Sequence, residues 1–159
     1  KVHNLYIPAG GDLPDMKLNP KFEHKINFLS EIKNKFFKGK KKKTILVGDF
    51  NIAPLPDDVW SHKALLNVVS HTKIETDLLS EIKKSGNWID TFREMKPSGK
   101  LYSWWSYRAR DWKISNRGRR LDHIWASQDL KSKLSKVQIF SEARDWERPS
   151  DHVPTLSIF

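Results

Sequence analysis

An amphipathic helix followed by a buried strand restricts the folds open to this chain. Asn19 can cap a helix whose first position is Pro20, and we expect that helix to end before Gly39. Its apolar residues recur at helical spacing, at Phe22, Ile26, Leu29, Ile32 and Phe36. The next apolar run, Thr44–Val47, is rich in β-branched residues and predicts a buried strand. A helix that buries one face beside such a strand indicates a layered α/β arrangement.

The second half of the chain changes to short strand candidates separated by long, basic loops. Before them, Thr72 and Glu75 form a capping-box pattern that predicts a helix closed by Gly86. We expect this helix to turn four apolar residues inward, namely Ile74, Leu78, Leu79 and Ile82. The strand candidates are residues 88–92, 101–105, 120–126, 136–140 and 153–158. This order of elements favours an α/β sandwich over a helical bundle or a pure β-barrel.

The composition is that of a globular domain with a core of its own. The 159 residues are 38% hydrophobic and 11% aromatic, which suits a single domain. No run of about eighteen apolar residues and no signal-peptide pattern is present, so the sequence supports neither a membrane span nor secretion. Because cysteine is absent, the chain has no disulfide framework and no thiolate metal site. We therefore expect a cytoplasmic, bacterial-type intracellular location without a membrane partner.

The charge of the chain points to a polyanionic partner. The formal net charge is +10, and seven of the eight arginines lie between Arg108 and Arg148. Five of the seven tryptophans share this second half, between Trp104 and Trp146. Guanidinium groups can bind phosphates and indole rings can stack on bases or sugars, so this half could form a nucleic-acid contact surface. The alternative is solvated charge around a tryptophan-rich core. The Lys40–Lys43 run is interpreted as a solvated loop, with a phosphate contact as the alternative.

Two polar residues follow the strand predicted at Thr44–Val47. If the strand continues through Asp49 and Asn51, their side chains point to the same side. A carboxylate and an amide carbonyl are hard oxygen ligands that suit Mg²⁺, which binds few protein groups and keeps waters for a substrate phosphate. The alternative for an isolated Gly-Asp-x-Asn is an Asx turn that leaves the strand.

A second acid lies inside a strand candidate, in the segment RRLDHIWAS. Asp122 is surrounded by strand-forming residues, and an acid in such a place costs free energy unless it has a partner. A histidine suits this role, because an aspartate that accepts from one ring nitrogen leaves the other nitrogen facing a substrate. His152, in the segment SDHVPTLSIF, could be that partner. His123 points the other way if the strand is regular.

Several motifs together resemble one family. They are Gly-Asp-Phe-Asn after a strand, Arg-Leu-Asp in a strand, Ser-Asp-His before the last strand, and Tyr6 in the pattern Asn-x-Tyr-x-Pro-x-Gly. The segment LYSWWSYRARDWKISNRGRRLDHIWAS is similar to the same family, whose phosphatase and sphingomyelinase relatives usually lack such a loop. These motifs resemble the exonuclease III family of Mg²⁺-dependent apurinic/apyrimidinic endonucleases, within the endonuclease/exonuclease/phosphatase superfamily. The resemblance runs from about Asn4 to Phe159.

The resemblance implies specific roles at the scissile phosphate. Asp49 would deprotonate or orient the attacking water, and Asn51 would hold a phosphate oxygen or the metal. Asp122 would orient His152, which would contact the phosphate and stabilise its developing charge. Tyr6 would donate a hydrogen bond to the same phosphate or exchange a proton with it.

The resemblance also implies a metal site and a DNA surface. Asp151 would lie near the metal together with Asp49 and Asn51, and the ion would be Mg²⁺, with Mn²⁺ possible. Trp104 would line the pocket for a base-free sugar, with Trp105 beside it. The loop from Tyr107 to Arg119 would reach into or across the duplex through basic residues, namely Arg108, Arg110 and Arg117.

The fold and function implied by the family set the expectations for residues 1–159. We expect one domain, part of a four-layer α/β sandwich of two packed β-sheets flanked by helices, whose N-terminal portion is absent. That portion carries an Asn and a Glu that is the principal metal ligand in the family, and Glu23 and Glu31 do not match it.

The expected function is incision of double-stranded DNA at abasic sites and trimming of its 3′ ends during DNA repair, with little Mg²⁺-dependent cleavage by these residues alone. A phosphatase or lipid phosphodiesterase of the same superfamily is one alternative. A nucleic-acid-binding module without catalysis is the other.

Overall fold

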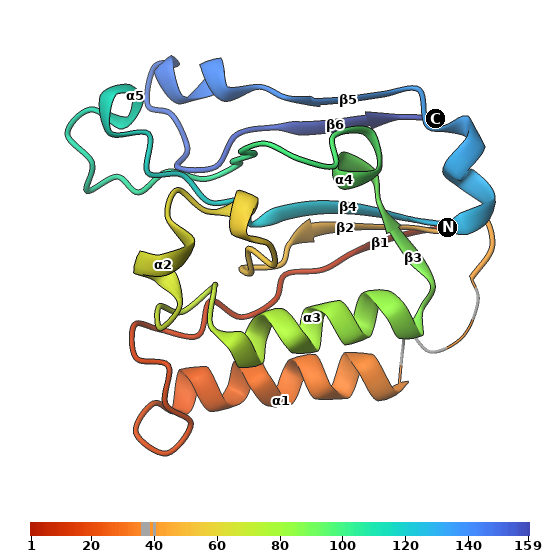
Figure 1. The fold of residues 1–159 in the computed structure, drawn as a ribbon, viewed down its shortest axis with the longest axis horizontal. Helices are drawn as coiled ribbons and strands as arrows, with labels where there is room; N and C mark the ends of the chain where they lie inside the picture. The colour runs from red at the N-terminus through yellow and green to blue at the C-terminus, as the bar shows by residue number, and fades with distance from the viewer. Residues whose placement is uncertain (36–38, 40) are drawn as a thin grey trace.

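Strand β2 (Ile45–Asp49) lies inside a four-stranded sheet with the order β1-β2-β4-β3 (Figure 1). The structure is a computed structural model and describes residues 1–35, 39 and 41–159. Strand β1 (Val2–Asn4) runs parallel to β2, whereas β4 (Asp122–Ser127) is antiparallel to both β2 and β3 (Trp88–Asp90). The mixed pairing agrees with the α/β class predicted from the sequence.

A second sheet packs on the face of the first sheet that is opposite the two long helices. It consists of the antiparallel strands β5 (Lys136–Ile139) and β6 (Thr155–Ile158). Thr91 ties the two sheets together, because its Oγ1 donates to the carbonyl of Ile124 in β4 and lies 2.8 Å from Oγ of Ser157 in β6. Figure 1 shows the resulting layers of helices, first sheet and second sheet.

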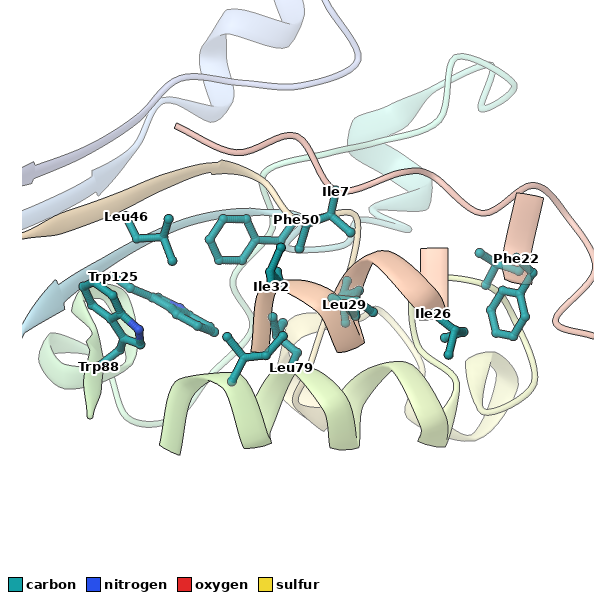
Figure 2. Close-up of a cluster of buried hydrophobic side chains, with 13 residues drawn as sticks. Ile7, Phe22, Ile26, Leu29, Ile32, Leu46, Phe50, Leu79, Trp88 and Trp125 are labelled. Atoms are coloured by element: carbon teal, nitrogen blue, oxygen red, sulfur yellow. The ribbon is translucent and has the colours of Figure 1, made fainter. Parts of the chain in front are cut away.

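Helices α1 (Pro20–Lys35) and α3 (Lys73–Ser85) cover the face of the four-stranded sheet away from β5 and β6. Asn19 caps α1 as predicted, since its Oδ1 accepts from the N–H of Lys21. The main core lies between these helices and the sheet, as Figure 2 shows. Residues of this core include Phe22, Ile26, Leu29 and Ile32 from α1, Leu79 and Ile82 from α3, Leu46 from β2, Trp88 from β3 and Trp125 from β4.

The register between β2 and β4 determines where the predicted functional residues meet. Asp49, at the end of β2, is paired directly opposite Asp122, at the start of β4. Gly48 is required just before Asp49, because a Cβ there would lie 1.9 Å from the carbonyl oxygen of Leu5. Its φ of +137° also disfavours other residues. This close approach lets the chain that follows β1 run along β2 and bring Tyr6 to the same end of the sheet.

Two predicted strands form differently in the structure. The strand predicted over residues 88–92 ends at Asp90, because the Asp90 side chain accepts from the N–H of Arg93 and starts helix α4 (Thr91–Met95). Residues 101–105 form isolated bridges at Trp104 in place of a continuous strand. Short elements that the sequence did not predict also occur: η1 (Pro56–Asp58), α2 (His62–Leu65), α5 (Trp112–Ser115), η2 (Gln128–Lys133) and η3 (Ser141–Asp145).

The capping box of α3 forms as predicted, with the Glu75 carboxylate accepting from the N–H of Thr72. The prediction that Ile74 faces inward is wrong, because its side chain is 41% exposed in the first turn of the helix. Leu78 is only partly buried against the core. The predicted contribution of Phe36, and Lys40 of the lysine run, lie outside the described residues. Within the described part of the chain, no helix is both long and apolar enough to cross a membrane.

Candidate active site

Asp49, Asp122 and His152 meet at one end of the four-stranded sheet. Nδ1 of His152 lies 2.8 Å from Oδ2 of Asp122, and Nε2 of His152 lies 3.8 Å from Oδ2 of Asp49. The histidine is therefore held by one aspartate while its second nitrogen faces the other aspartate. His123, the neighbour of Asp122, points into the core as predicted, where its Nε2 lies 2.8 Å from the carbonyl oxygen of Ile52.

An Asx turn brings Asn51 to the side of Asp49. Strand β2 ends at Asp49, so the expectation that the strand continues through Asn51 is wrong and the alternative of a turn is confirmed. Oδ1 of Asp49 accepts from the Asn51 N–H at 2.9 Å, and Asn51 has a left-handed φ of +51°. The Asn51 amide then donates to Oδ2 of Asp49 and to the carbonyl of Ile7, each at 2.9 Å. The turn itself places both side chains together.

Trp104 connects the segment that carries His152 to the segment that carries Arg119. It forms antiparallel bridges with both residues, so the side chains of Arg119, Trp104 and His152 lie in one row on the same face. The indole Nε1 of Trp104 also donates to Oδ2 of Asp151 at 2.9 Å. The adjacent Asp-His pair therefore has two different partners, Trp104 for Asp151 and Asp122 for His152.

Burial and neighbouring charges shift the pKa values of Asp49 and His152. Burial raises the pKa of Asp49, and the charge of Asp122 adds to this shift, although the hydrogen bond from the Asn51 backbone opposes it. Burial disfavours the charged form of His152, but the hydrogen bond and the charge of Asp122 outweigh it, so the pKa of His152 is raised. A basic imidazole beside a carboxylate that binds protons more readily suits proton transfer and the stabilisation of an oxyanion.

A cleft of about 650 Å³ opens above these groups and collects most of the residues predicted from the sequence. It is lined by eight of them: Tyr6, Asp49, Asn51, Trp104, Arg108, Arg117, Asp151 and His152. Asp122 contacts His152 but does not line the cleft, and Arg110 is exposed outside the cleft lining. Tyr6 is 68% exposed at the rim, where its hydroxyl can reach a bound group.

Trp105 does not lie beside Trp104 in the cleft, contrary to the expectation from the sequence. It is 4% exposed and packs with Tyr102, Ala143 and Val153 in a separate core cluster. The reason is the alternation of side chains along the extended chain, which turns neighbouring residues to opposite faces. Trp105 therefore supports the segment from the inside.

Several residues of the cleft were not predicted from the sequence. The Arg119 guanidinium lies over the Trp104 ring, with 5.3 Å between its central carbon and the ring centroid. Arg117, which was predicted, lies in the same way 4.8 Å over Trp60, which was not. Arg119 lies in the arginine-rich segment that the sequence analysis had singled out, so the composition of that segment could have identified it as a cleft residue. Trp60 lies far from that run and had none.

The side chains of the site also offer donor atoms for a metal ion. Asp49, Asp122 and His152 each offer one ligand atom, and these atoms lie within 4.8 Å of one another, so the described residues include a group that could hold a metal ion. Asp151 is not in this group but lines the same cleft. Two carboxylates and the Asn51 amide give oxygen donors of the kind that suits a hard divalent cation.

A family model covers most of the chain. Residues 29–152 match the model described as "Endonuclease/Exonuclease/phosphatase family". The chain belongs to the endonuclease/exonuclease/phosphatase family. Its curated relatives confirm the resemblance to the exonuclease III branch of that family. Exodeoxyribonuclease III of Haemophilus influenzae is 28% identical over 170 residues, covering 99% of this chain and 61% of that protein. An exodeoxyribonuclease of Bacillus subtilis is 34% identical over 121 residues, covering 74% and 45%.

Solved structures of the endonuclease/exonuclease/phosphatase family share the fold. An apurinic/apyrimidinic endonuclease from Archaeoglobus fulgidus superposes with a TM-score of 0.90 at 27% identity, over 99% of this chain and 60% of that one. A 3′ phosphatase from Neisseria, bound to a product DNA hairpin, gives a TM-score of 0.84 at 28% identity with the same coverage. The fold predicted from the family resemblance is thereby confirmed. The chain spans about three fifths of the length of these proteins.

Proposed function

We propose that this chain carries the phosphate-cleaving centre of a metal-dependent DNA nuclease of the exonuclease III type, which incises at abasic sites and trims 3′ ends. The observation that carries the proposal is the arrangement of Asp122, His152 and Asp49 in a cleft with Trp104 and Arg117. The first three residues form a site for acid–base and oxyanion chemistry. The last two provide the aromatic and cationic contacts that a nucleic-acid strand requires.

The protein groups have separable roles in this proposal. Asp122 holds Nδ1 of His152, so that Nε2 faces the cleft and can stabilise charge on the scissile phosphate. Asp49 accepts the proton of the attacking water, a task favoured by the raised pKa that burial gives this carboxyl group. Tyr6, at the rim, donates a hydrogen bond to the phosphate. Asn51 fixes Asp49 through the Asx turn and offers its carbonyl oxygen.

A divalent cation is part of the proposal because the donor set fits one. Asp49 and Asn51 would hold it, with Asp151 nearby, and an oxygen donor set of few protein ligands suits Mg²⁺, with Mn²⁺ as the alternative. When bound, such an ion supplies Lewis-acid stabilisation of charge on the phosphate. The glutamate that serves as principal ligand in the exonuclease III family has no counterpart in these residues, so we expect weak metal binding by this chain alone.

DNA is the proposed substrate for two reasons. The cleft and its surroundings carry Arg108 and Arg117, and the whole chain has a formal net charge of +10. In addition, the relatives are named as exodeoxyribonucleases and as an apurinic/apyrimidinic endonuclease, and one of the similar structures contains a DNA hairpin. An abasic site suits a cleft with an aromatic wall, because a base-free sugar leaves the stack at a lower cost than an intact nucleotide.

The proposal is tested by incision of a duplex with one abasic site, in Mg²⁺ or Mn²⁺ and in EDTA. The assay compares this chain with a version extended at the N-terminus, and a matched duplex without the lesion serves as control. We expect metal-dependent incision by the extended protein and little by this chain. Robust incision by the short chain would contradict the expectation that the metal site requires an additional ligand.

The two alternative functions give different results in parallel assays. Hydrolysis of an inositol phosphate or of sphingomyelin without incision of DNA would identify a phosphatase or lipid phosphodiesterase. DNA binding by the extended protein without any metal-dependent cleavage would identify a binding module.

A further inference from the structure

Two consecutive arginines, Arg119 and Arg120, have opposite surroundings. Arg120 is fully buried, and its guanidinium donates to the carboxylates of Asp58 and Asp90 at 2.7 to 3.0 Å. These two carboxylates stabilise the charged guanidinium, despite its burial, and raise its pKa. Arg120 is thus a structural residue whose charge is neutralised inside the protein. Arg119 faces the cleft instead.

The Arg119 guanidinium is fixed in position but has no anionic partner. Its Nη1 donates to the carbonyl of Val69 at 3.1 Å and to Oγ of Ser70 at 2.8 Å, and its central carbon lies 5.3 Å from the centroid of the Trp104 ring. Its Nε is buried and has no hydrogen-bond acceptor among residues 1–35, 39 and 41–159. Within the same residues no carboxylate lies within ion-pair distance of this guanidinium. Burial also lowers the pKa of Arg119, as expected for a cation removed from water.

The support behind Arg119 is itself buried and rigid. Ser70 has an uncommon φ of +85°, and its N–H donates to both oxygens of the Glu75 carboxylate at 3.0 and 2.9 Å. Glu75 is in turn paired with Lys25, and neither side chain is exposed. The charge of Glu75 favours the charged form of Arg119 but forms no ion pair with it, so the protein maintains a partly desolvated cation without a direct anionic partner at the wall of a cleft. Such a cation is unfavourable unless an anion neutralises it, and an anion from a ligand can do so.

Arg119 is too far from His152 to bind the same phosphate. Arg119 and His152 flank Trp104 in the bridged row, so two strand spacings, roughly 10 Å, separate their backbones. The guanidinium cannot swing across this gap without losing Ser70 and Val69. An anion bound at Arg119 must therefore be a different group of the same ligand.

We propose that Arg119 is a specificity-determining residue that binds a second phosphate of the substrate strand, next to the phosphate that is hydrolysed. This inference rests on the proposed function, because it takes the strand to be nucleic acid. A planar guanidinium fork matches phosphate oxygens, and its stacking on Trp104 orients the fork before binding. The site thereby favours a polynucleotide over a small phosphomonoester, which has no second phosphate to offer.

The test measures binding in EDTA, so that it does not depend on cleavage. Fluorescence anisotropy compares the wild type with Arg119→Gln, Arg119→Lys and the charge-matched control Lys84→Gln, which lies on α3. The ligand is a duplex with one abasic site, and a set of variants carries a single neutral methylphosphonate at each phosphate near the lesion. Arg119→Gln should bind roughly ten- to hundredfold more weakly, and its log–log salt slope should fall by about 0.9.

The methylphosphonate series distinguishes a direct contact from a structural role. One neutral position should weaken the wild type by roughly tenfold and leave Arg119→Gln unaffected, because the contact is already lost. Arg119→Lys should be intermediate, since it keeps the charge but loses the fork and the stacking. If Arg119→Gln melts at a lower temperature, the same series with Arg119→Lys serves as the test.

Two results would overturn the proposal: unchanged affinity and salt slope for Arg119→Gln, or equal losses for wild type and variant at every neutral position. The proposed function fails independently of it. A specific coupling in EDTA together with no metal-dependent incision by the extended protein would retain the phosphate contact and refute the nuclease. Metal-dependent incision without any coupling between Arg119 and a phosphate would support the nuclease and refute the phosphate contact.

Discussion

Removing the ammonium group of Lys25 should strongly destabilise the protein. Lys25 on α1 and Glu75 on α3 are both fully buried, with 2.6 Å between Nζ and Oε1. Nζ also donates to the carbonyls of Asn51 at 2.8 Å and Ala9 at 3.2 Å. Lys25→Met keeps most of the side-chain volume but leaves a buried carboxylate without its cation and two carbonyls without a donor. Breaking a buried pair in this way costs about 3–5 kcal/mol of the free energy of unfolding.

The assay is urea unfolding at pH 7, with thermal unfolding as a second measurement. For a chain of this size the expected loss corresponds to a fall of roughly 6 to 20 °C in the melting temperature. The double variant Lys25→Met with Glu75→Gln should recover part of the loss, because the uncompensated charge is gone. Lys84→Met, at an exposed position of α3, controls for the loss of a lysine.

Two unfolding results would contradict this prediction. If Lys25→Met unfolds within about 1 kcal/mol of the wild type, the pair is not a net stabiliser and the ammonium group is replaceable by apolar packing. If the single variant is strongly destabilised but the double variant shows no recovery, the loss comes from the carbonyls of Asn51 and Ala9 and not from the charge of Glu75.

Three further predictions concern catalysis, DNA binding and acid stability. In the extended protein, His152→Ala should lower kcat by roughly 100-fold or more with little change in KM, and Asp122→Asn should cause a smaller loss of kcat. Steady-state kinetics that show only a change in KM would contradict the role of His152 in stabilising charge on the phosphate. Replacing Arg110 and Arg117 by Ala should reduce the log–log salt slope of DNA binding by about 1–2, and an unmoved slope would show that neither residue contacts a phosphate of the DNA. Burial lowers the pKa of His123 to about 4, so the unfolded state takes up a proton first, and stability should fall as the pH drops from 6.5 towards 4. His123→Phe should flatten this part of a plot of unfolding free energy against pH by up to about 3 kcal/mol, and an unchanged slope would assign the acid sensitivity to other groups.

The regular elements with strong local signals could be predicted from the sequence. The proline and cap at the start of α1 and the capping box of α3 act within a few residues, so they are readable without knowledge of the fold. Strand β2 likewise follows from a β-branched apolar run. Ile74 shows the limit, because helical spacing does not determine how far around the first turn the apolar face extends.

The candidate site was predictable in its residue types and partly in its pairing. Asp122 inside an apolar strand required a partner, and this requirement identified His152 correctly as its contact. The Asx turn at Asn51 was a known alternative that local sequence could not decide. Trp60 and Arg119 could not be assigned to the same cleft, because their approach depends on bridges between segments far apart in the chain.

The distance along the chain between the groups of the site has a consequence for how the protein becomes functional. Asp122 and His152 are separated by 30 residues, Trp104 and Asp151 by 47, and Asn51 and Ile7 by 44. Each of these pairs closes a long loop, so its entropy cost is paid before its contact contributes, and such contacts form slowly. Helices α1 and α3 can acquire their backbone hydrogen bonds well before the cleft exists. During refolding, helical circular dichroism should therefore return ahead of DNA binding, with a population of helical but non-binding molecules in between.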